Sequence, residues 1–435
     1  MNLREYIYDV IIVGSGSAGG VLVHQLAKLK PGLKILLIEK GRQAKIGEDG
    51  KFLPYLLKHY RKFAIGSRSK EGTIVYAAEM LGGTSVVAFG NLVWSDKLSD
   101  KFLKLGVNLE SVRKEAEELT GVKPLPMHRI IRGSKMIMQA SNASGHEMLP
   151  MPKGVKDICD GCGNCVLGCH TGAKWDVRRG IEEALGMDNV DLLTGEKVKR
   201  VLFSYNEARG VELWSGKKIF GNKVILCAGG LATPTILLNS GVEAGNGLTI
   251  HPFMNVYGQP KYHVTQQKGM SMACYYKPAE DILLSPFIDQ RSQKELACGF
   301  IWSLLHPINK ILGIMVKVAD PESTGKVNSD GSFNYKIMPQ VRERLLEGGR
   351  IARAILLEAG ATKRSLVDTM RFSRGAHPSC TAKLGEVVDF DFRVVGKRGL
   401  YVTDASVIPL ATGTPPILLL TAINIYFSKL LCDML

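Results

Sequence analysis

Residues 8–19 read YDVIIVGSGSAG, and this stretch decides the fold class. Its first six residues are apolar and rich in β-branched side chains, which predicts a buried parallel strand. An apolar-periodic helix is expected from about Ala18 to Leu29, followed by a second strand over Lys34–Ile38 that closes at Glu39. Strand, glycine-rich turn, helix, strand and acidic residue together predict a mononucleotide-binding unit. We therefore expect an α/β fold built on a parallel sheet.

Each glycine of the turn has an expected role. Gly14 allows the tight turn, Gly16 lets the backbone approach a pyrophosphate, and Gly19 allows close packing of the helix. Glu39 is expected to accept hydrogen bonds from ribose hydroxyls. The remaining cofactor contacts of this unit are expected at Ser17 and Ala18. The fingerprint alone does not distinguish FAD from NAD.

The bulk composition limits the remaining possibilities. The 435 residues are enough for two or three domains. The net charge is +15, with a dense basic stretch over Lys58–Lys70. We interpret this stretch first as a solvated face and second as a docking site for an acidic redox partner such as a ferredoxin. No nucleic-acid motif accompanies it. The apolar segment Ile417–Leu431 contains Asn424 and Lys429, so it predicts a buried helix, with no membrane span and only peripheral association left open.

Four of the nine cysteines lie within eleven residues, at Cys159, Cys162, Cys165 and Cys169. The spacing C-x2-C-x2-C-x3-C is that of bacterial ferredoxins and predicts an iron–sulfur cluster. A structural zinc site and a metal-free thiol loop are the alternatives. In two-cluster ferredoxins the fourth cysteine serves the other cluster, so a three-iron cluster or a remote fourth ligand stays possible beside a 4Fe-4S cluster. This clustering suits a reducing compartment, so we expect a cytoplasmic protein.

Several later segments resemble the glucose–methanol–choline (GMC) oxidoreductases. Leu81-Gly-Gly-Thr-Ser85 with Asn91 is similar to that family's flavin-contacting loop. A second segment, 228–241, is similar to another family signature but has Gly230 where a small non-glycine residue is usual. The closing segment, His377 through Pro409, completes the match. The resemblance covers residues 8–431 except for about 259–371.

The resemblance implies FAD and a glutathione-reductase-like flavin domain with a smaller, sheet-based substrate domain. It implies a flavin domain from 1–100, 150–258 and 372–435, with the cysteine loop 159–169 inserted. Residues 101–149 would be a helical excursion and 259–371 the substrate domain. Cofactor contacts are implied at Gly82, Gly83, Thr84, Asn91, Val198, Ala228, Gly229, Asp404, Ala405 and Pro415.

The resemblance also implies a catalytic role for His377 as acid–base on a substrate hydroxyl. Histidine suits this role because its pKa lies near working pH. The family's second position, normally His or Asn, falls at Pro415, whose side chain can neither donate nor accept. Thr414 or another side chain would have to supply the second hydrogen bond. His251-Pro252 resembles a family turn, and Cys380 is interpreted as a packing residue rather than a cluster ligand.

Local patterns predict further elements. Residues 196–203, 208–214 and 217–220 alternate like an antiparallel meander, and 223–227 predicts a buried strand. Gln340–Glu358 predicts a helix weakened by Gly348 and Gly349. Residues 269–272, 321–334 and those from Phe287 onward are expected to lie over a pocket.

Together these features predict an FAD-dependent dehydrogenase that oxidises a CH–OH group by hydride transfer to flavin N5. Electrons would leave through the cluster to a one-electron acceptor. Two alternatives remain open at this point: a ferredoxin-driven reductase of a carbonyl or alkene, and a non-catalytic flavin/iron–sulfur electron-transfer subunit of a larger complex.

Overall fold

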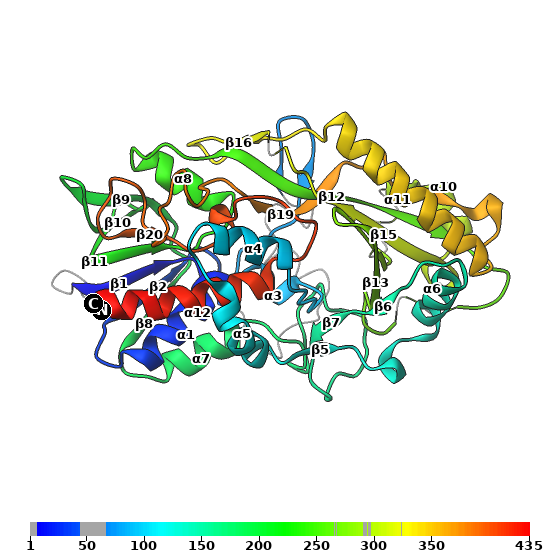
Figure 1. The fold of residues 1–435 in the computed structure, drawn as a ribbon, viewed down its shortest axis with the longest axis horizontal. Helices are drawn as coiled ribbons and strands as arrows, with labels where there is room; N and C mark the ends of the chain where they lie inside the picture. Colours follow the sequence, from blue (N-terminus) through cyan, green and yellow to red (C-terminus); the bar gives the residue numbers. More distant parts are fainter. Residues whose placement is uncertain are drawn as a thin grey trace.

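The computed structural model describes residues 7–43, 67–264, 266, 268–289, 294, 297–322 and 324–435. Residues 58–66 of the basic stretch lie outside this range. Two sheets organise the chain, one in each half of the molecule (Figure 1). The α/β fold class is confirmed.

The first sheet has seven strands and carries the nucleotide-binding unit. Its order is β8 (Val190–Thr194), β2 (Ile35–Glu39), β1 (Tyr8–Val13), β11 (Lys218–Leu226), β10 (Glu207–Leu213) and β9 (Val198–Ser204), with β20 (Leu400–Val402) paired to β11. The strands from β8 to β11, and β20, run parallel, whereas β9, β10 and the start of β11 form the predicted antiparallel meander. Parallel strands of this kind are covered on both faces, which explains their continuous apolar sequence.

The prediction of separate strands at 217–220 and 223–227 is wrong. They form the single strand β11, which pairs antiparallel with β10 at Ile219 and parallel with β1 at Ile225. Gly221 marks the change of partner, and a Cβ there would lie 2.8 Å from the Ile11 side chain. Gly221 is therefore required by close packing between the strands.

Helices cover this sheet. α1 (Ser17–Leu29) packs against α7 (Arg178–Leu185) and against the C-terminal helix α12 (Ile417–Met434), which also contacts α5 (Arg113–Thr120). α12 is long and apolar enough to cross a membrane by length and composition. Most of it is nevertheless buried in the core of this half, as predicted.

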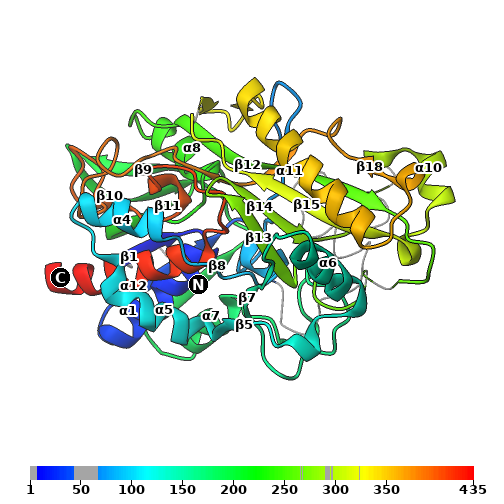
Figure 2. The same cartoon turned by 45° about the vertical axis from the view of Figure 1, so that its right-hand side comes forward.

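The second sheet has eleven strands. Its main order is β3 (Ser67–Arg68), β4 (Ile74–Val75), β19 (Arg374–Ser379), β12 (Asn246–Gly258), β15 (Leu312–Val318), β14 (Ile282–Pro286), β13 (Cys274–Ala279) and β6 (Leu149–Pro150); β16 (Gly325–Val327), β17 (Phe333–Asn334) and β18 (Val367–Asp368) complete it. The predicted helix is present as α11 (Pro339–Glu358), which packs on β12, β14 and β15 beside α6 (Arg132–Ala143) (Figure 2). A second apolar cluster fills this half.

The predicted domain limits run across this second sheet. β12 and β19 pair within it, although 150–258 and 372–435 are assigned above to the flavin domain. The excursion 101–149 is mainly helical as predicted, but its α5 packs on α12 whereas its α6 packs on α11. The long β12 thus reaches from beside α8 into the sheet under α11 (Figures 1 and 2).

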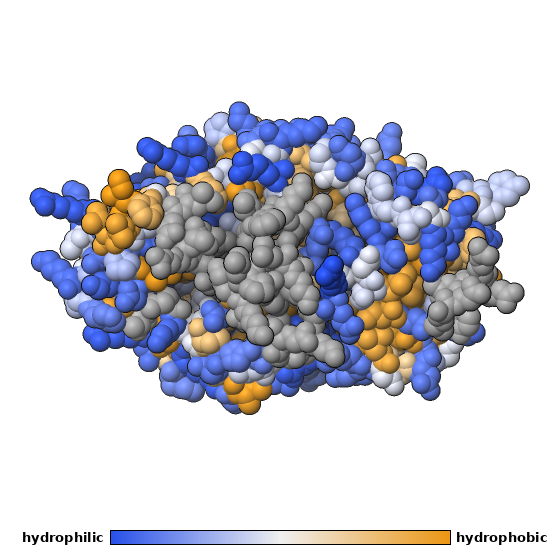
Figure 3. Space-filling view, turned by 180° about the vertical axis from the view of Figure 1, so that it is seen from behind, coloured by the Kyte–Doolittle hydropathy of each residue, from blue (hydrophilic) through white to orange (hydrophobic). Residues whose placement is uncertain are grey.

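The remaining elements are short. They are α3 (Thr84–Val87), α4 (Asp96–Lys104), α8 (Ala232–Asn239), α10 (Phe300–Leu305), the pair β5 (Val122–Pro124) and β7 (Pro152–Gly154), and the 3-10 turns Leu109–Val112, Met127–Arg129, Ile308–Lys310, Lys363–Ser365 and Ala405–Val407. Outside the grey atoms, the face seen in Figure 3 is mainly hydrophilic, with apolar side chains gathered in a few separate patches.

Candidate active site

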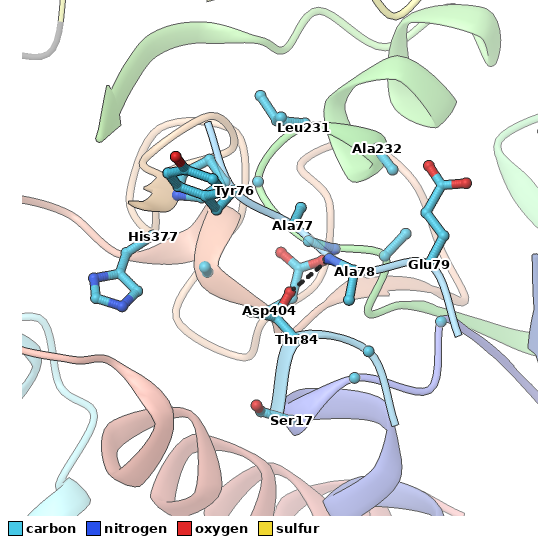
Figure 4. Close-up of a pocket in the computed structure, with 18 of the residues that line it drawn as sticks. Ser17, Tyr76, Ala77, Ala78, Glu79, Thr84, Leu231, Ala232, His377 and Asp404 are labelled. Carbon is cyan, nitrogen blue, oxygen red and sulfur yellow. Dashed lines mark hydrogen bonds between the residues drawn. The ribbon is translucent and has the colours of Figure 1, made fainter. Parts of the chain in front are cut away.

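A cavity of about 420 Å³ lies where the two sheets meet. It is lined by the nucleotide-binding turn at one end and by His377 at another, with Asp404 and Thr84 between them (Figure 4). Of the predicted cofactor contacts, the following line it: Gly14, Gly16, Ser17, Ala18, Glu39, Gly83, Thr84, Asn91, Val198, Ala228, Gly229, Asp404, Ala405 and Pro415. The predicted segments over a pocket contribute Met272, Phe287, Asp330 and Gly331.

The turn between β1 and α1 has the geometry predicted for it. Gly14 adopts φ 99°, and a Cβ there would lie 2.5 Å from the Cys227 carbonyl. A Cβ on Gly16 would meet nothing within 4 Å and would point into open space. Gly19 lies outside the cavity, because it packs against the Gly14 carbonyl, as expected for a helix-packing glycine. Gly16, Ser17 and Ala18 line the cavity at the N-terminus of α1, where the first amides of a helix have no partner within the helix.

Glu39 holds the turn in place. Its Oε2 accepts hydrogen bonds from the Ser15 amide (3.0 Å) and hydroxyl (2.7 Å), and its Oε1 accepts from the Gly41 amide (2.8 Å). The side chain is buried but lines the cavity. Glu39 thus positions the backbone of the turn. This role was not predicted from the sequence, which predicted only a ribose contact.

Asp404 performs a similar task on the opposite wall. Its Oδ2 accepts from the Gly229 amide (2.7 Å) and the Thr233 hydroxyl (2.5 Å). Its Oδ1 accepts from the Ser406 amide (2.8 Å). Burial raises the pKa of this carboxyl group, although all of these hydrogen bonds lower it. Asp404 joins two loops that the sequence places 175 residues apart.

Two glycines have structural roles beside the cavity. Gly82 does not line it, and a Cβ there would lie 2.8 Å from the Arg178 side chain, so this predicted contact is a packing position. Gly230 departs from the family pattern because the backbone of Pro378 approaches closely: a Cβ would lie 2.1 Å from its carbonyl oxygen. That approach brings the segment containing His377 beside the loop after β11.

His377 lies on β19 and is paired with His251 on β12. Their Nδ1 atoms are 3.0 Å apart and their rings pack edge to face. His377 adopts φ 59°, a left-handed conformation uncommon for a side chain of its size. Burial lowers the pKa of His377 well below its ordinary value, and nearby Lys317 lowers it further. The pKa of His251 is lowered to about 3 for the same two reasons.

The prediction that His251-Pro252 forms a turn is wrong. Both residues lie inside β12, where His251 is paired with Ala376 of β19. The turn was expected only from the family resemblance. The strand accommodates Pro252, and His251 becomes the neighbour of the predicted acid–base.

Pro415 lines the cavity at the start of α12, as do Pro416 and Ile417. The first turn of this helix tolerates proline because its amides have no partner within the helix. Its positive end therefore faces the cavity and favours negative charge there. The Thr414 hydroxyl is 2.6 Å from that of Thr412, so it is engaged within the loop, and it does not line the cavity.

The cysteine loop closes on a short two-stranded base and reaches the same cavity. Val155 pairs with Lys174, and the Lys156 amide donates to the Ala173 carbonyl (2.9 Å). Val166 and Leu167, which lie between the third and fourth cysteines, both line the cavity. The loop is therefore a wall of the candidate active site.

The four cysteine sulfurs are not gathered into a tetrahedral zinc-type group. Among the described residues, the one set of potential ligands whose atoms all lie within 4.8 Å of one another is Asp160, Cys162 and His170, all exposed. His170 Nε2 lies 2.9 Å from the Asp160 carboxylate. Cys380 is fully buried among core side chains, as predicted.

Lys153 lies on β7 between the cysteine loop and the cavity, and it is buried. Its Nζ donates to Asn91 Oδ1 (2.5 Å) and to the carbonyls of Phe89 (2.9 Å) and Ser271 (3.0 Å). Burial lowers its pKa to about 8, while the charges of Cys165 and Cys159 act in the opposite direction.

Lys174, at the other side of the loop base, is equally buried. Its Nζ donates to the carbonyls of Val86 (2.5 Å) and Ala88 (2.7 Å), and burial lowers its pKa. Within the described part of the chain, neither lysine forms a salt bridge with a carboxylate. These two buried cations were not predicted from the sequence, because each depends on carbonyl groups from distant segments.

Comparison with known proteins gives relatives along nearly the whole chain. An uncharacterised protein of Methanocaldococcus jannaschii is 28% identical over 97% of this chain and 99% of its own length. A long-chain-alcohol oxidase of Arabidopsis thaliana is 25% identical over 82% of this chain and 48% of its own length. Oxygen-dependent choline dehydrogenases of Acinetobacter baumannii are 26% identical over 53% of this chain.

The fold is that of a solved structure, pyridoxine 4-oxidase from "Mesorbium loti". It superposes with a TM-score of 0.72 over 97% of this chain and 98% of that one, at 18% sequence identity. Two family models described as GMC oxidoreductase match residues 8–253 and 318–423. The resemblance inferred from the sequence motifs is thus confirmed over more than half of the chain, and the protein belongs to the GMC oxidoreductase family.

Proposed function

We propose that this protein is an FAD-dependent dehydrogenase that oxidises the CH–OH group of a small alcohol-type substrate. Electrons would leave singly through an iron–sulfur cluster at Cys159, Cys162, Cys165 and Cys169 to an acidic one-electron acceptor such as a ferredoxin. The observation that carries this proposal is that the cysteine loop, through Val166 and Leu167, lines the cavity that also contains the nucleotide-binding turn and His377.

GMC oxidoreductases bind FAD, and the residues of this cavity fit that cofactor. Gly16 and Gly229 line the cavity, and an added Cβ at either would meet nothing within 4 Å, so the backbone is open to a ligand. The amides at the start of α1 suit a pyrophosphate, and Glu39 lies where an acceptor for ribose hydroxyls is expected. The positive end of α12 suits a group that becomes negatively charged on reduction. When bound, FAD supplies the hydride acceptor, N5 of its ring.

His377 would take the hydroxyl proton of the substrate. Its lowered pKa keeps the ring neutral at working pH, so a ring nitrogen is available as a base. If His377 donates its Nδ1–H to His251 Nδ1, its Nε2 is left as the acceptor. The alcohol then loses one proton and one hydride and becomes a carbonyl compound.

The cysteine loop fits an iron–sulfur cluster in donor chemistry and charge. Four thiols at ferredoxin spacing lie in a loop whose glycines at 161, 163, 168 and 172 all adopt positive φ and turn the backbone tightly. A thiolate-ligated cluster is anionic, and Lys153 and Lys174 are buried cations without carboxylate partners among the described residues. In this arrangement Cys162 would leave its contact with Asp160 and His170.

The proposed cluster, as a second electron carrier beside FAD, favours a dehydrogenase over an oxidase. A cluster beside the cavity gives the two electrons from the substrate a stepwise route that does not require oxygen. Thiolate ligands also call for a reducing compartment, and we propose the cytoplasm.

The first test is the absorption spectrum of anaerobically purified protein, with FAD, iron, zinc and acid-labile sulfide quantified. The proposal expects one FAD per chain and iron matched by sulfide. Zinc without sulfide would overturn the electron-relay part and leave an FAD-dependent alcohol oxidoreductase.

The second test is turnover of a panel of alcohols with one-electron dyes, comparing the wild type with His377→Gln. Because a positioned acid–base contributes about 10²–10⁴-fold, His377→Gln should lose at least about 100-fold in kcat while retaining FAD. His128→Gln, on an exposed 3-10 turn, is the matched control. Equal turnover of both variants would favour a non-catalytic subunit, and activity only in the reductive direction would favour a ferredoxin-driven reductase.

A further inference from the structure

Lys317 lies in the middle of a buried strand and lines the cavity. It belongs to β15, whose sequence LGIMVKV is otherwise apolar and buried at every position. Met315, two residues earlier and on the same face, also lines the cavity. Phe253, directly opposite Lys317 on β12, does so too. The lysine therefore emerges from an apolar sheet surface into the candidate active site.

Its amino group is unlike those of the other buried lysines in the described part of the chain. Lys153 and Lys174 each donate to three oxygen atoms, and Lys294 donates to two backbone carbonyls. Lys317, which is only 2% exposed, has neither a hydrogen bond nor an ion pair with any described residue.

A buried carboxylate of the cavity wall, Asp289, is already engaged with another cation. Asp289 lines the cavity, but it forms a bidentate ion pair with buried Arg374 (2.9 and 2.7 Å). The charged group that acts on Lys317 is another cation, Lys277, and burial together with this repulsion lowers the pKa of Lys317 to about 7. The charge of Lys317 in turn reaches both His251 and His377. Lys317 is therefore a buried lysine of the cavity wall that has no counter-ion among the described residues, and it lies near the proposed acid–base.

We propose that Lys317 binds an anionic oxygen group of the substrate, a carboxylate or a phosphate, while the substrate hydroxyl lies at His377. This inference rests on the proposed oxidation of a CH–OH group. It also supplies the substrate contact that Pro415 cannot make.

We expect the site to prefer an anionic substrate over a neutral one because a buried ammonium group is costly to leave unpaired. An anionic substrate provides a charge-assisted hydrogen bond inside an apolar wall, which is stronger than a bond between neutral groups. A neutral alcohol of the same shape leaves the amino group desolvated or forces it to lose its proton. We therefore expect discrimination of at least about tenfold between matched anionic and neutral ligands.

Ligand binding can be measured without turnover. The holoenzyme is titrated with butyrate, butyramide and propyl phosphate, and the perturbation of flavin absorbance is recorded. Butyrate or propyl phosphate should bind at least about tenfold more tightly than butyramide, and the tighter of the two identifies the anion class. Lys317→Met should abolish the preference and Lys317→Arg should retain part of it, because Arg keeps the charge. Lys326→Met, at an exposed lysine of the same sheet, should behave like the wild type.

Turnover separates this inference from the proposed function. With 4-hydroxybutyrate and 1,4-butanediol as substrates, the wild type should favour the acid in kcat/KM, and Lys317→Met should not. Equal binding of butyrate and butyramide to the wild type would overturn the inference. Lys317-dependent binding of butyrate without oxidation of any hydroxy compound would support the anion site and overturn the proposed function.

Discussion

His251 is the residue whose role depends most on its neighbour. Its Nδ1 is 3.0 Å from that of His377, and burial lowers its pKa to about 3, so it stays neutral and can accept a hydrogen bond. If His251 accepts the Nδ1–H of His377, it fixes the tautomer whose Nε2 would act as the proposed base. We therefore propose that His251 positions His377.

His251→Ala should lower kcat by about 10–100-fold, because the tautomer and the orientation of His377 are no longer fixed. His251→Asn should recover part of the loss, since its amide oxygen can accept the same hydrogen. The measurement is kcat with FAD content determined in parallel, and His128→Asn serves as the exposed control. An unchanged kcat in His251→Ala, or no difference between Ala and Asn, would contradict this role.

At the scale of elements, the loop base formed by β7 and the segment at Lys174 connects the cysteine loop to the cavity. Lys153 donates to Asn91, which lines the cavity, while its charge is coupled to Cys165 and Cys159. A buried positive charge beside an anionic cluster stabilises the reduced form, which carries one more negative charge.

If the proposed cluster is present, Lys153→Met should therefore lower its reduction potential or reduce the iron content of the purified protein. Lys123→Met is a close control, because Lys123 pairs with Lys153 across the β5–β7 ladder but is exposed. The checks are redox titration and iron analysis under anaerobic conditions. Identical potentials and iron contents in both variants would show that Lys153 has no electrostatic role toward the cysteines.

The limits of α11 were predicted from the sequence, but its close packing against β15 was not. Gly348, which weakens the helix by propensity, lies against β15, where an added Cβ would be 2.4 Å from Val316 Cγ1. The glycine is thus required for close approach of helix and sheet.

Gly348→Ala should destabilise the protein by about 1–3 kcal/mol through overpacking. Gly186→Ala is the control: this glycine ends α7 with φ −76°, and a Cβ there makes only ordinary contact, with the Glu183 carbonyl at 3.4 Å. That change should be neutral or stabilising by up to about 1 kcal/mol. Urea unfolding of both variants measures the difference, and equal destabilisation would contradict the packing argument.

At the scale of the whole molecule, local patterns predicted what depends on neighbours in sequence. β1 has the predicted limits because its apolar, β-branched run is continuous, and the helices α1 and α11 begin within one residue of theirs because their apolar residues recur at helical spacing. Features that depend on distant partners were missed. β12 contains His251-Pro252 because it pairs with β15 and β19, which come from far along the chain. The buried position of Lys317 could have been suspected from the sequence, because a lysine within an otherwise apolar strand is unusual.

The same long-range burial makes the molecule sensitive to acid. His24, His251 and His377 all have pKa values lowered by burial, and His377 and His251 also face the charge of Lys317. In the unfolded chain each would have a pKa of about 6.5. Above that pH both states are neutral, and the contribution of these histidines to stability is fully present. Below it the unfolded state takes up protons that the folded state excludes, so stability falls as the pH is lowered.

We therefore expect the free energy of unfolding to decrease between pH 6.5 and pH 5, by up to about 1.4 kcal/mol per pH unit for each histidine. Urea unfolding of the FAD-depleted protein at several pH values measures this slope without a contribution from the cofactor. His251→Gln should make the slope shallower, because this side chain does not titrate, whereas the exposed His128→Gln should leave it unchanged. A free energy of unfolding that stays constant over this range would mean that the buried histidines accept protons in the folded state. In that case the neutral pair required for proton removal by His377 would not exist.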